Sequence, residues 1–430
     1  MSINSGDLDI RSQRVVTTDG EVAASIKLRA GKIVEIGSYE SSDATDVGEM
    51  VILPGLVDPH VHINEPGRTE WEGFETATAA AAAGGITTLV DMPLNSAPVT
   101  TTATALETKR AAAAGKLKVD VGFHAGLVPG NEDEIAGLLD ASVRGVKAFL
   151  CHSGIDEFPA ATEKELRQVM PLLADRDVPL LVHAELESAV PAMADPRRYA
   201  DYLATRPAKF ERDAIDLMIQ LCRETRCRTH IVHLADAGSL PTLRDARTEG
   251  LPLTVETCPH YLTFAAEEIP DGATQFKCAP PIRDADNREG LWAGLAEGVI
   301  DFIASDHSPC PPEMKQLATG RFDQAWGGIS SLQLGLPIVW TEASRRGHSL
   351  AEVVEWMCHA PARLVGCEFG IQVGAPANLA LFDADESFVV RGESLHHRHP
   401  LTPYEGRNLL GAVSRVYHHG LALSDSGGLL

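Results

Sequence analysis

The stretch Leu53-Pro54-Gly55-Leu56-Val57-Asp58-Pro59-His60-Val61-His62-Ile63 is a mostly apolar run that closes with two histidines. A short, nearly continuous apolar run is typical of a buried strand in a parallel sheet. His60 and His62 are two residues apart, so in a strand both side chains point to the same side. Two imidazoles that face one point can bind one metal ion. The stretch therefore predicts a buried strand with a metal site at its end.

More apolar runs follow this stretch, and helical patterns such as 76–83, 163–174 and 211–224 lie between most of them. The runs are Thr87–Met92, Lys118–Leu127, Gly145–Leu150, Leu180–Ala184, Thr229–Leu234, Leu253–Thr257 and Phe302–Ser305. Apolar strands that alternate with helices imply a parallel sheet covered on both faces. Eight such units in about 300 residues predict an α/β fold of the TIM-like (β/α)8 barrel type. An open, doubly wound sheet is the alternative.

Both ends of the 430-residue chain differ from its centre, because they contain short strands separated by turns. Each end is too small to form a domain. Since the termini of many domains lie close together, we expect the two ends to form one small β-sandwich. The predicted division is the first part of the sandwich at 1–52, the barrel at 53–370, and the second part of the sandwich with a C-terminal tail at 371–430.

The composition limits the classes of partner. The formal net charge is −23, from 60 acidic and 37 basic residues, which disfavours nucleic acid and anionic membranes as partners. The eight cysteines are isolated and form no CxxC pair, which predicts reduced thiols in a cytoplasmic protein. The N-terminus lacks the apolar run of a signal peptide, and no run reaches the roughly 18 apolar residues of a membrane span.

The ends of the predicted strands carry side chains that can bind metal, at the barrel edge where active sites lie. They are His60, His62, His183, His233 and Asp306. Taken singly, each histidine could be packed in the core, and Asp306 could be a helix cap. Together they favour a site for a borderline divalent metal such as zinc. His230 is an alternative to His233 as the metal ligand of this strand. We prefer His233 because it lies at the strand end.

Lys147 interrupts the apolar run Gly145–Leu150. A lysine at a strand edge with its amine in water is the ordinary alternative. Inside a buried strand, however, an unpaired ammonium is costly, and its pKa falls. A neutral amine can react with carbon dioxide to form a carbamate, whose two oxygens could bridge two metal ions.

This set of residues resembles the metal ligands of the binuclear cyclic amidohydrolases, the family of hydantoinases, dihydropyrimidinases, dihydroorotases and allantoinases. The resemblance covers nearly the whole chain. It implies two divalent metal ions per subunit, with zinc as the default. It also implies a ligand set in which His60, His62 and Asp306 hold one ion, His183 and His233 hold the other, and N-carboxylated Lys147 bridges both.

Within the family, the segments 62–73, 91–96 and 153–159 resemble the allantoinase branch. Dihydroorotases place an arginine that grips the substrate carboxylate where this chain has Asn64, which fits a neutral ring instead. Hydantoinases carry a tyrosine near the position of His152. The resemblance implies hydrolysis of the cyclic amide bond of allantoin to allantoate, in purine catabolism. A hydantoinase or dihydropyrimidinase is the alternative, and a non-catalytic scaffold is disfavoured because no ligand is missing.

The resemblance also implies roles in the reaction. Asp306 would take the proton of a water activated by the two metals and pass it to the leaving nitrogen. The expected substrate contacts are Asn95, Ser153, Gly327 and Gly328. Arg68 is either a substrate group or a salt-bridge partner within its loop, and His260 is expected at the rim of the pocket. The family usually forms homo-oligomers, which implies a homotetramer.

The remaining histidines of the C-terminal piece need no special role. They are His396, His397, His399, His418 and His419, and we expect them on the surface.

Overall fold

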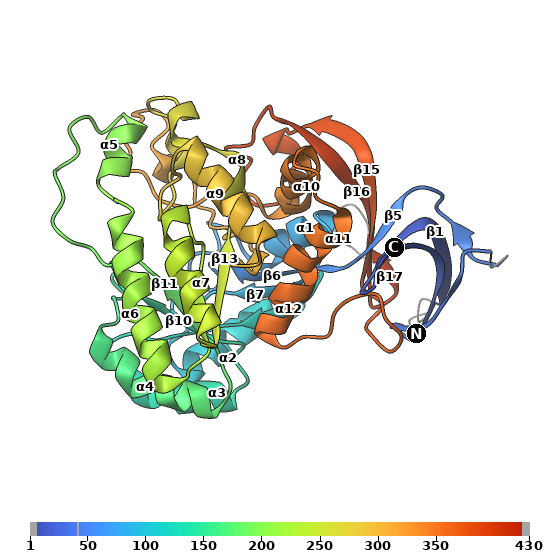
Figure 1. Ribbon diagram of the computed structural model, residues 1–430, viewed down its shortest axis with the longest axis horizontal. Coiled ribbons are helices and arrows are strands. Elements are labelled where there is room, and N and C mark those ends of the chain that lie inside the picture. Colours follow the sequence, from blue (N-terminus) through green and yellow to red (C-terminus); the bar gives the residue numbers. More distant parts are fainter. Residues whose placement is uncertain (1–6, 41–42, 424–430) are drawn as a thin grey trace.

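The computed structural model describes residues 7–40 and 43–423, so the last residues of the predicted C-terminal tail, 424–430, lie outside the described residues. Two unlike parts lie next to each other (Figure 1). One consists of parallel strands with helices around them, and the other is a twisted sheet that contains both the first strand, β1, and the last, β17. The two ends of the chain therefore share one sheet.

The parallel strands confirm an α/β fold. The first sheet has the order β6 (Leu56–Val61), β7 (Ile86–Asp91) and β8 (Asp120–Phe123). The second runs from β9 (Ala125–Gly126) through β10 (Val146–Phe149), β11 (Leu180–His183), β12 (Thr229–Ile231) and β13 (Leu253–Thr257) to β14 (Phe302–Ile303). Each predicted apolar run overlaps one or two of these strands. Val61, at the end of β6, forms a parallel bridge with His307, which follows β14.

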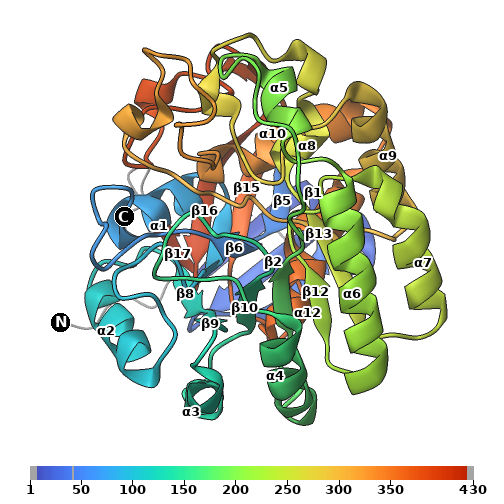
Figure 2. The same cartoon turned by 90° about the vertical axis from the view of Figure 1, so that its left-hand side faces the viewer.

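The helices lie mainly around the parallel strands (Figure 2). They are α1 (Phe74–Ala83), α2 (Ala103–Ala113), α3 (Ile135–Asp140), α4 (Glu163–Asp175), α5 (Tyr199–Ala204), α6 (Lys209–Thr225), α7 (Leu240–Thr248), α8 (Pro259–Thr263), α9 (Ala285–Ala296), α10 (Gly335–Arg345), α11 (Leu350–Val354) and α12 (Ala360–Val365). The helix predicted at 163–174 is α4, which begins with a capping box of Thr162 and Glu165 and buries Leu166, Val169 and Leu173. Among the described residues, none of these helices has the length and apolar character needed to cross a bilayer.

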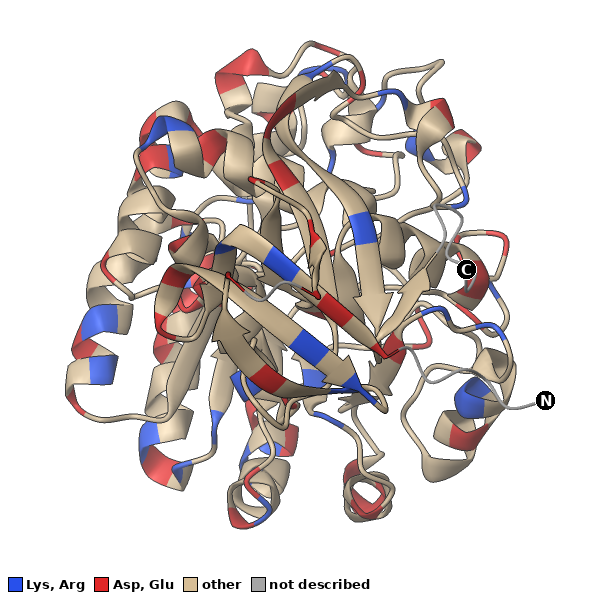
Figure 3. Cartoon of the chain, turned by 90° about the vertical axis from the view of Figure 1, so that its right-hand side faces the viewer, with Lys and Arg blue, Asp and Glu red and all other residues tan. Residues whose placement is uncertain are grey.

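The other part is an eight-stranded sheet built from both ends of the chain. Its order is β17 (Leu421–Leu423), β16 (Asn408–His418), β15 (Leu379–Val389), β5 (Val51–Pro54), β1 (Leu8–Thr17), β2 (Gly20–Arg29) and β3 (Lys32–Ser38), with β4 (Thr45–Asp46) paired to β1. Its core mixes residues from both ends, such as Ile26 and Ile52 with Leu379. On this side of the molecule, acidic and basic residues are interspersed (Figure 3).

The opening stretch 53–63 divides between the two parts. β5 pairs with β15 in the eight-stranded sheet, and β6 pairs with β7 in the parallel one. Gly55 lies at the division, where a Cβ atom would come within 2.2 Å of Thr87 Oγ1. A residue without a side chain is therefore required where the strand passes from one sheet to the other.

Candidate metal and substrate site

A cavity of about 680 Å³ lies at the C-terminal ends of the parallel strands. All the predicted ligand side chains line it, namely His60, His62, Lys147, His183, His233 and Asp306. The four predicted substrate contacts, Asn95, Ser153, Gly327 and Gly328, line it as well. The structure thus brings together residues that are up to 268 positions apart in the chain, from Gly328 back to His60.

Asp306 faces the two histidines of the first strand. Its Oδ1 atom is 3.2 Å from His60 Nε2 and 3.3 Å from His62 Nε2. His62 Nδ1 lies 2.9 Å from the carbonyl oxygen of Leu94, which can only accept a hydrogen bond. His62 Nδ1 therefore carries the proton, and the lone pair of Nε2 faces the cavity. His233 adjoins this group, since potential ligand atoms of His60, His233 and Asp306 lie within 4.8 Å of one another.

His183 is held on two sides. Phe149 stacks on its ring with a centroid separation of 4.5 Å, and Glu185 Oε2 lies 2.8 Å from its Nε2 atom. Since the carboxylate accepts from Nε2, Nδ1 is the nitrogen left for the cavity, and it lies 3.0 Å from His233 Nε2.

Several buried nitrogen atoms in this cavity make no hydrogen bond to any described residue. They are Lys147 Nζ, His60 Nε2 and His233 Nδ1. Burial lowers the pKa of Lys147 to about 8, although Asp306 and Glu256 act in the opposite direction. Nitrogen donors that are buried without partners are costly unless another group binds them. These residues fit a site for metal ions with imidazole and carboxylate ligands.

Glu256, near the C-terminal end of β13, contacts the proposed ligands on the side away from the cavity. Its carboxylate contacts His60 Nδ1, lies 3.0 Å from His230 Nε2 and accepts a 3.3 Å hydrogen bond from the backbone of His233. Burial lowers the pKa of His60, but Glu256 and Asp306 outweigh this effect and raise it to about 9. Glu256 was missed in the sequence, although it interrupts an apolar run in the same way as Lys147. His230 does not line the cavity.

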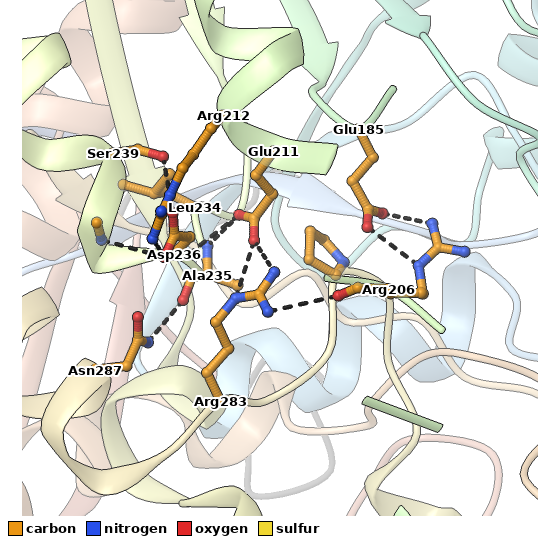
Figure 4. Close-up of polar contacts among 12 residues, drawn as sticks. Glu185, Arg206, Glu211, Arg212, Leu234, Ala235, Asp236, Ser239, Arg283 and Asn287 are labelled. Carbon is orange, nitrogen blue, oxygen red and sulfur yellow. Dashed lines mark hydrogen bonds and ion pairs between the residues drawn. The ribbon is translucent and has the colours of Figure 1, made fainter. Parts of the chain in front are cut away.

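The buried carboxylate of Glu185 forms an ion pair with the partly exposed Arg206 (Figure 4). Burial raises the pKa of Glu185, but hydrogen bonds and charge interactions with His183 and Arg206 lower it to about 2. Glu185 is therefore ionised and holds the His183 ring in one orientation. Sequence reasoning missed this pair. The available signal was an acidic residue, Glu185, only two positions after the predicted ligand His183.

The loop after His233 is held by a buried pair, Glu211 and Arg283 (Figure 4). Glu211 accepts hydrogen bonds from the backbone N–H groups of Ala235 at 2.9 Å and Asp236 at 3.2 Å. His233 itself has φ +40°, in the left-handed region that costs energy for a residue with a side chain. The hydrogen bonds to Glu211 stabilise the loop in this conformation.

The predicted substrate contact Asn95 is anchored through its neighbours. Its Nδ2 donates to Asn64 Oδ1 at 3.3 Å, and its carbonyl oxygen accepts from Arg68 at 2.6 Å. Arg68 also pairs with Glu157 at 2.8 Å, so it serves as a salt-bridge partner that joins two loops. Asn64 is not among the residues that line the cavity and contributes to it through Asn95.

Ser153 and the two glycines differ in how freely they can meet a ligand. The Ser153 hydroxyl donates to the carbonyl oxygen of Phe158 at 2.6 Å. Gly328 has φ +135°, and a Cβ atom there would lie 2.3 Å from the carbonyl oxygen of Ser308. At Gly327 the nearest atoms to such a Cβ are 4.0 Å away. The backbone therefore requires glycine at 328 but not at 327.

Two expectations about other histidines were wrong. His260 is fully buried in α8 and does not line the cavity, so it is not at the rim. His397 is only 3% exposed and lies beside His307, with ring centroids 5.5 Å apart. The reason is that the segment around His397 packs onto the loop of Glu72, whose carboxylate accepts from the backbone of Arg398. Such a contact between remote segments leaves no local pattern in the sequence.

Comparisons with known proteins agree with this site. The Amidohydrolase family matches residues 51–422. An allantoinase from Streptomyces avermitilis is 48% identical over 98% of this chain and 96% of its own length, and one from Arabidopsis thaliana is 45% identical over 97% and 88%. The structure of an L-hydantoinase (dihydropyrimidinase) from Arthrobacter aurescens matches with a TM-score of 0.91 and 31% identity, covering 99% of this chain and 97% of that one. The chain belongs to the amidohydrolase family and, within it, to the group of the allantoinases.

Proposed function

We propose that this protein hydrolyses the cyclic amide bond of allantoin to give allantoate, a step of purine catabolism. The observation that carries the proposal is the convergence of the predicted ligands, four histidines, Lys147 and Asp306, on one cavity. The relatives named allantoinase, at 48% and 45% identity over almost the whole chain, support the choice of allantoin.

We infer that this cavity holds two divalent metal ions, with zinc as the default. His60, His62 and Asp306 would hold one ion and His183 and His233 the other, with N-carboxylated Lys147 between them. The Nζ atom of Lys147 and the Nε2 atom of His60, both buried without hydrogen-bond partners, support this assignment. When bound, such ions supply Lewis-acid chemistry, which lowers the pKa of water and polarises a carbonyl group.

The residues of the chain would then move the proton. Burial raises the pKa of Asp306, but His60 and His62 outweigh this effect and hold it well below its usual range. The carboxylate is thus ionised, and in the proposed mechanism it accepts the proton of the attacking water as the new C–O bond forms. It returns this proton to the ring nitrogen as the C–N bond breaks. General acid–base catalysis of this kind contributes about 10²–10⁴-fold.

The cavity wall suits an uncharged ring. We expect the amide of Asn95, Ser153 and the backbone at Gly327 and Gly328 to orient the carbonyl and N–H groups of the substrate. Apart from the proposed metal-bridging Lys147, the cationic side chains Arg206 and Lys277 on the wall already have partners. Arg206 pairs with Glu185, and Lys277 donates to the carbonyl oxygen of Ala325 at 2.6 Å. A substrate carboxylate would have to compete with these partners.

We also infer that the parallel strands close into a (β/α)8 barrel spanning 53–370. The backbone N–H of His62 donates to the carbonyl oxygen of His307 at 2.8 Å, which connects the end of β6 to the segment after β14 and supports closure. The core shared by both chain ends supports a β-sandwich made from 1–52 and 371–430. The eight unpaired cysteines agree with a cytoplasmic protein, and a homotetramer remains our expectation from the family.

The decisive experiment is an assay of the purified protein with allantoin, hydantoin and dihydrouracil, before and after chelation and with metal restored. We expect allantoin to be the preferred substrate, with turnover lost on chelation and recovered with metal. Preference for hydantoin or dihydrouracil would favour the alternative, a hydantoinase or dihydropyrimidinase. A protein that carries no stoichiometric metal and turns over none of the three would be a scaffold.

A further inference from the structure

A second cluster of potential ligands lies far from the catalytic cavity. Asp120 is the first residue of β8, His418 is the last residue of β16, and His419 follows in the turn before β17. Because Asp120 begins a parallel strand, it lies at the end opposite to the strand ends that carry the catalytic cavity. The three side chains also line a separate cavity of about 1010 Å³, which adjoins both the parallel sheet and the eight-stranded sheet.

The distances in this cluster suit a metal ion. Asp120 Oδ2 lies 3.3 Å from His418 Nε2 and 3.2 Å from His419 Nε2, and all three ligand atoms lie within 4.8 Å of one another. Four-coordinate zinc holds nitrogen and oxygen ligands at about 2.0–2.1 Å, so neighbouring ligands of a tetrahedron are about 3.3–3.4 Å apart. One ion could therefore bind all three atoms with little movement.

His418 points a ring nitrogen at the Asp120 carboxylate. Its Nε2 atom is buried and makes no hydrogen bond to any described residue, although the Asp120 carboxylate is close. The Asp120 carboxylate, 3.3 Å away, is close enough to pair with a protonated His418 ring or to share a metal ion with it. A buried ring nitrogen in this situation is satisfied when it binds a metal.

The backbone holds His419 in place before any ion binds. Its N–H donates to Asn378 Oδ1 at 2.8 Å, and the next residue, Gly420, donates to the carbonyl oxygen of Ala377 at 2.8 Å. His419 adopts φ +48°, which brings its ring beside that of His418, with centroids 4.3 Å apart. Two consecutive residues of an extended strand would instead point to opposite faces.

We propose that Asp120, His418 and His419 form a metal site, separate from the catalytic cavity, for a borderline divalent cation such as Zn²⁺, Ni²⁺ or Cu²⁺. Two imidazoles and one carboxylate favour these ions over Mg²⁺ or Ca²⁺, which prefer oxygen ligands. The adjoining cavity leaves the fourth position open to solvent. Because the ligands come from two sheets, the ion links the parallel part to the sheet formed by the chain ends.

The test compares the metal content and thermal stability of the full-length holoenzyme with those of two variants. Asp120→Asn preserves the shape of the side chain, and His419→Asn tolerates the left-handed backbone. Each protein is dialysed against the same low concentration of free Zn²⁺, its bound zinc is counted, and its Tm is recorded with and without Zn²⁺. His348→Gln is the matched control, since His348 pairs with the single carboxylate of Glu352.

We expect each cluster variant to hold one zinc ion per chain fewer than the parent and the control, to lose the zinc-dependent rise in Tm, and to retain turnover of allantoin. Equal zinc content and equal Tm response in all four proteins would overturn the proposal, as would loss of the same ion in the control. If one variant fails to fold, the other gives the same comparison. The count does not depend on which substrate the catalytic cavity accepts.

Discussion

The Nδ1 atom of His183 lies 3.0 Å from the Nε2 atom of His233, although the two residues are 50 positions apart. They come together because β11 and β12 are neighbours in the parallel sheet and each histidine lies at or just after the end of its strand. Both histidines are also supported from outside the cavity. Glu185 contacts the ring of His183, and Glu211 binds the backbone of the loop that follows His233. Two ring nitrogens this close share a proton or, in our proposal, one metal ion.

Replacing the proposed proton carrier should stop turnover. We expect Asp306→Ala to lower kcat for allantoin by at least about 10²-fold, because general acid–base catalysis of this kind contributes about 10²–10⁴-fold. Steady-state kinetics with the metal content measured in parallel checks this. Asp323→Ala is the control, because Asp323 also lines the cavity but pairs with Arg321. An Asp306→Ala enzyme with parental kcat would contradict the assignment.

Removing the bridging lysine should empty the metal site. We expect Lys147→Ala to lose bound metal and activity, since the carbamate that holds both ions cannot form. Short carboxylic acids added to this variant should restore part of both, because they supply the missing oxygens. Metal analysis with and without the acid is the measurement, and the exposed Lys164→Ala is the control. A Lys147→Ala protein that retains two ions per chain would exclude a bridging role.

The buried ion pair of Glu211 and Arg283, next to the loop after His233, should affect both stability and metal affinity. Glu211→Gln leaves the Arg283 guanidinium buried without its charged partner, which costs about 3–5 kcal/mol of unfolding free energy. The N–H groups of Ala235 and Asp236 also lose a charged acceptor and keep only a neutral amide oxygen, so we expect metal affinity to fall about 10–100-fold. Urea unfolding and metal titration measure the two effects. Glu297→Gln, at an exposed ion pair with Arg244, should change neither.

The two neighbouring glycines of the cavity wall should respond differently to the same substitution. Gly328→Ala forces a side chain into the carbonyl oxygen of Ser308 at a positive φ, so we expect a loss of about 1–3 kcal/mol in stability together with reduced turnover. Gly327→Ala meets nothing closer than 4.0 Å and should remain folded. Thermal unfolding and kinetics of the pair are the check, and equal stability would contradict the geometry.

The parts that could be read from the sequence share one property, which is a strong local pattern. The spacing of His60 and His62, the lysine inside the run Gly145–Leu150, and the histidines at strand ends all follow from the alternation of side chains in a strand and from the burial of parallel sheets. Glu256 could have been found in the same way, because it also interrupts an apolar run. The support of Asn95 by Asn64 and Arg68 could not have been found, because it depends on how two loops that are remote in the sequence pack together.

The sequence by itself determined the alternation of strands and helices, the position of each proposed ligand at a strand end, and the family to which they point. Only the tertiary structure decided which of these side chains meet, that His397 is buried, and that Asp120 lies against His418 and His419. The physical reason is that strand and helix patterns arise from interactions between residues a few positions apart. The contacts of remote loops arise instead from the packing of whole elements, which no local pattern records.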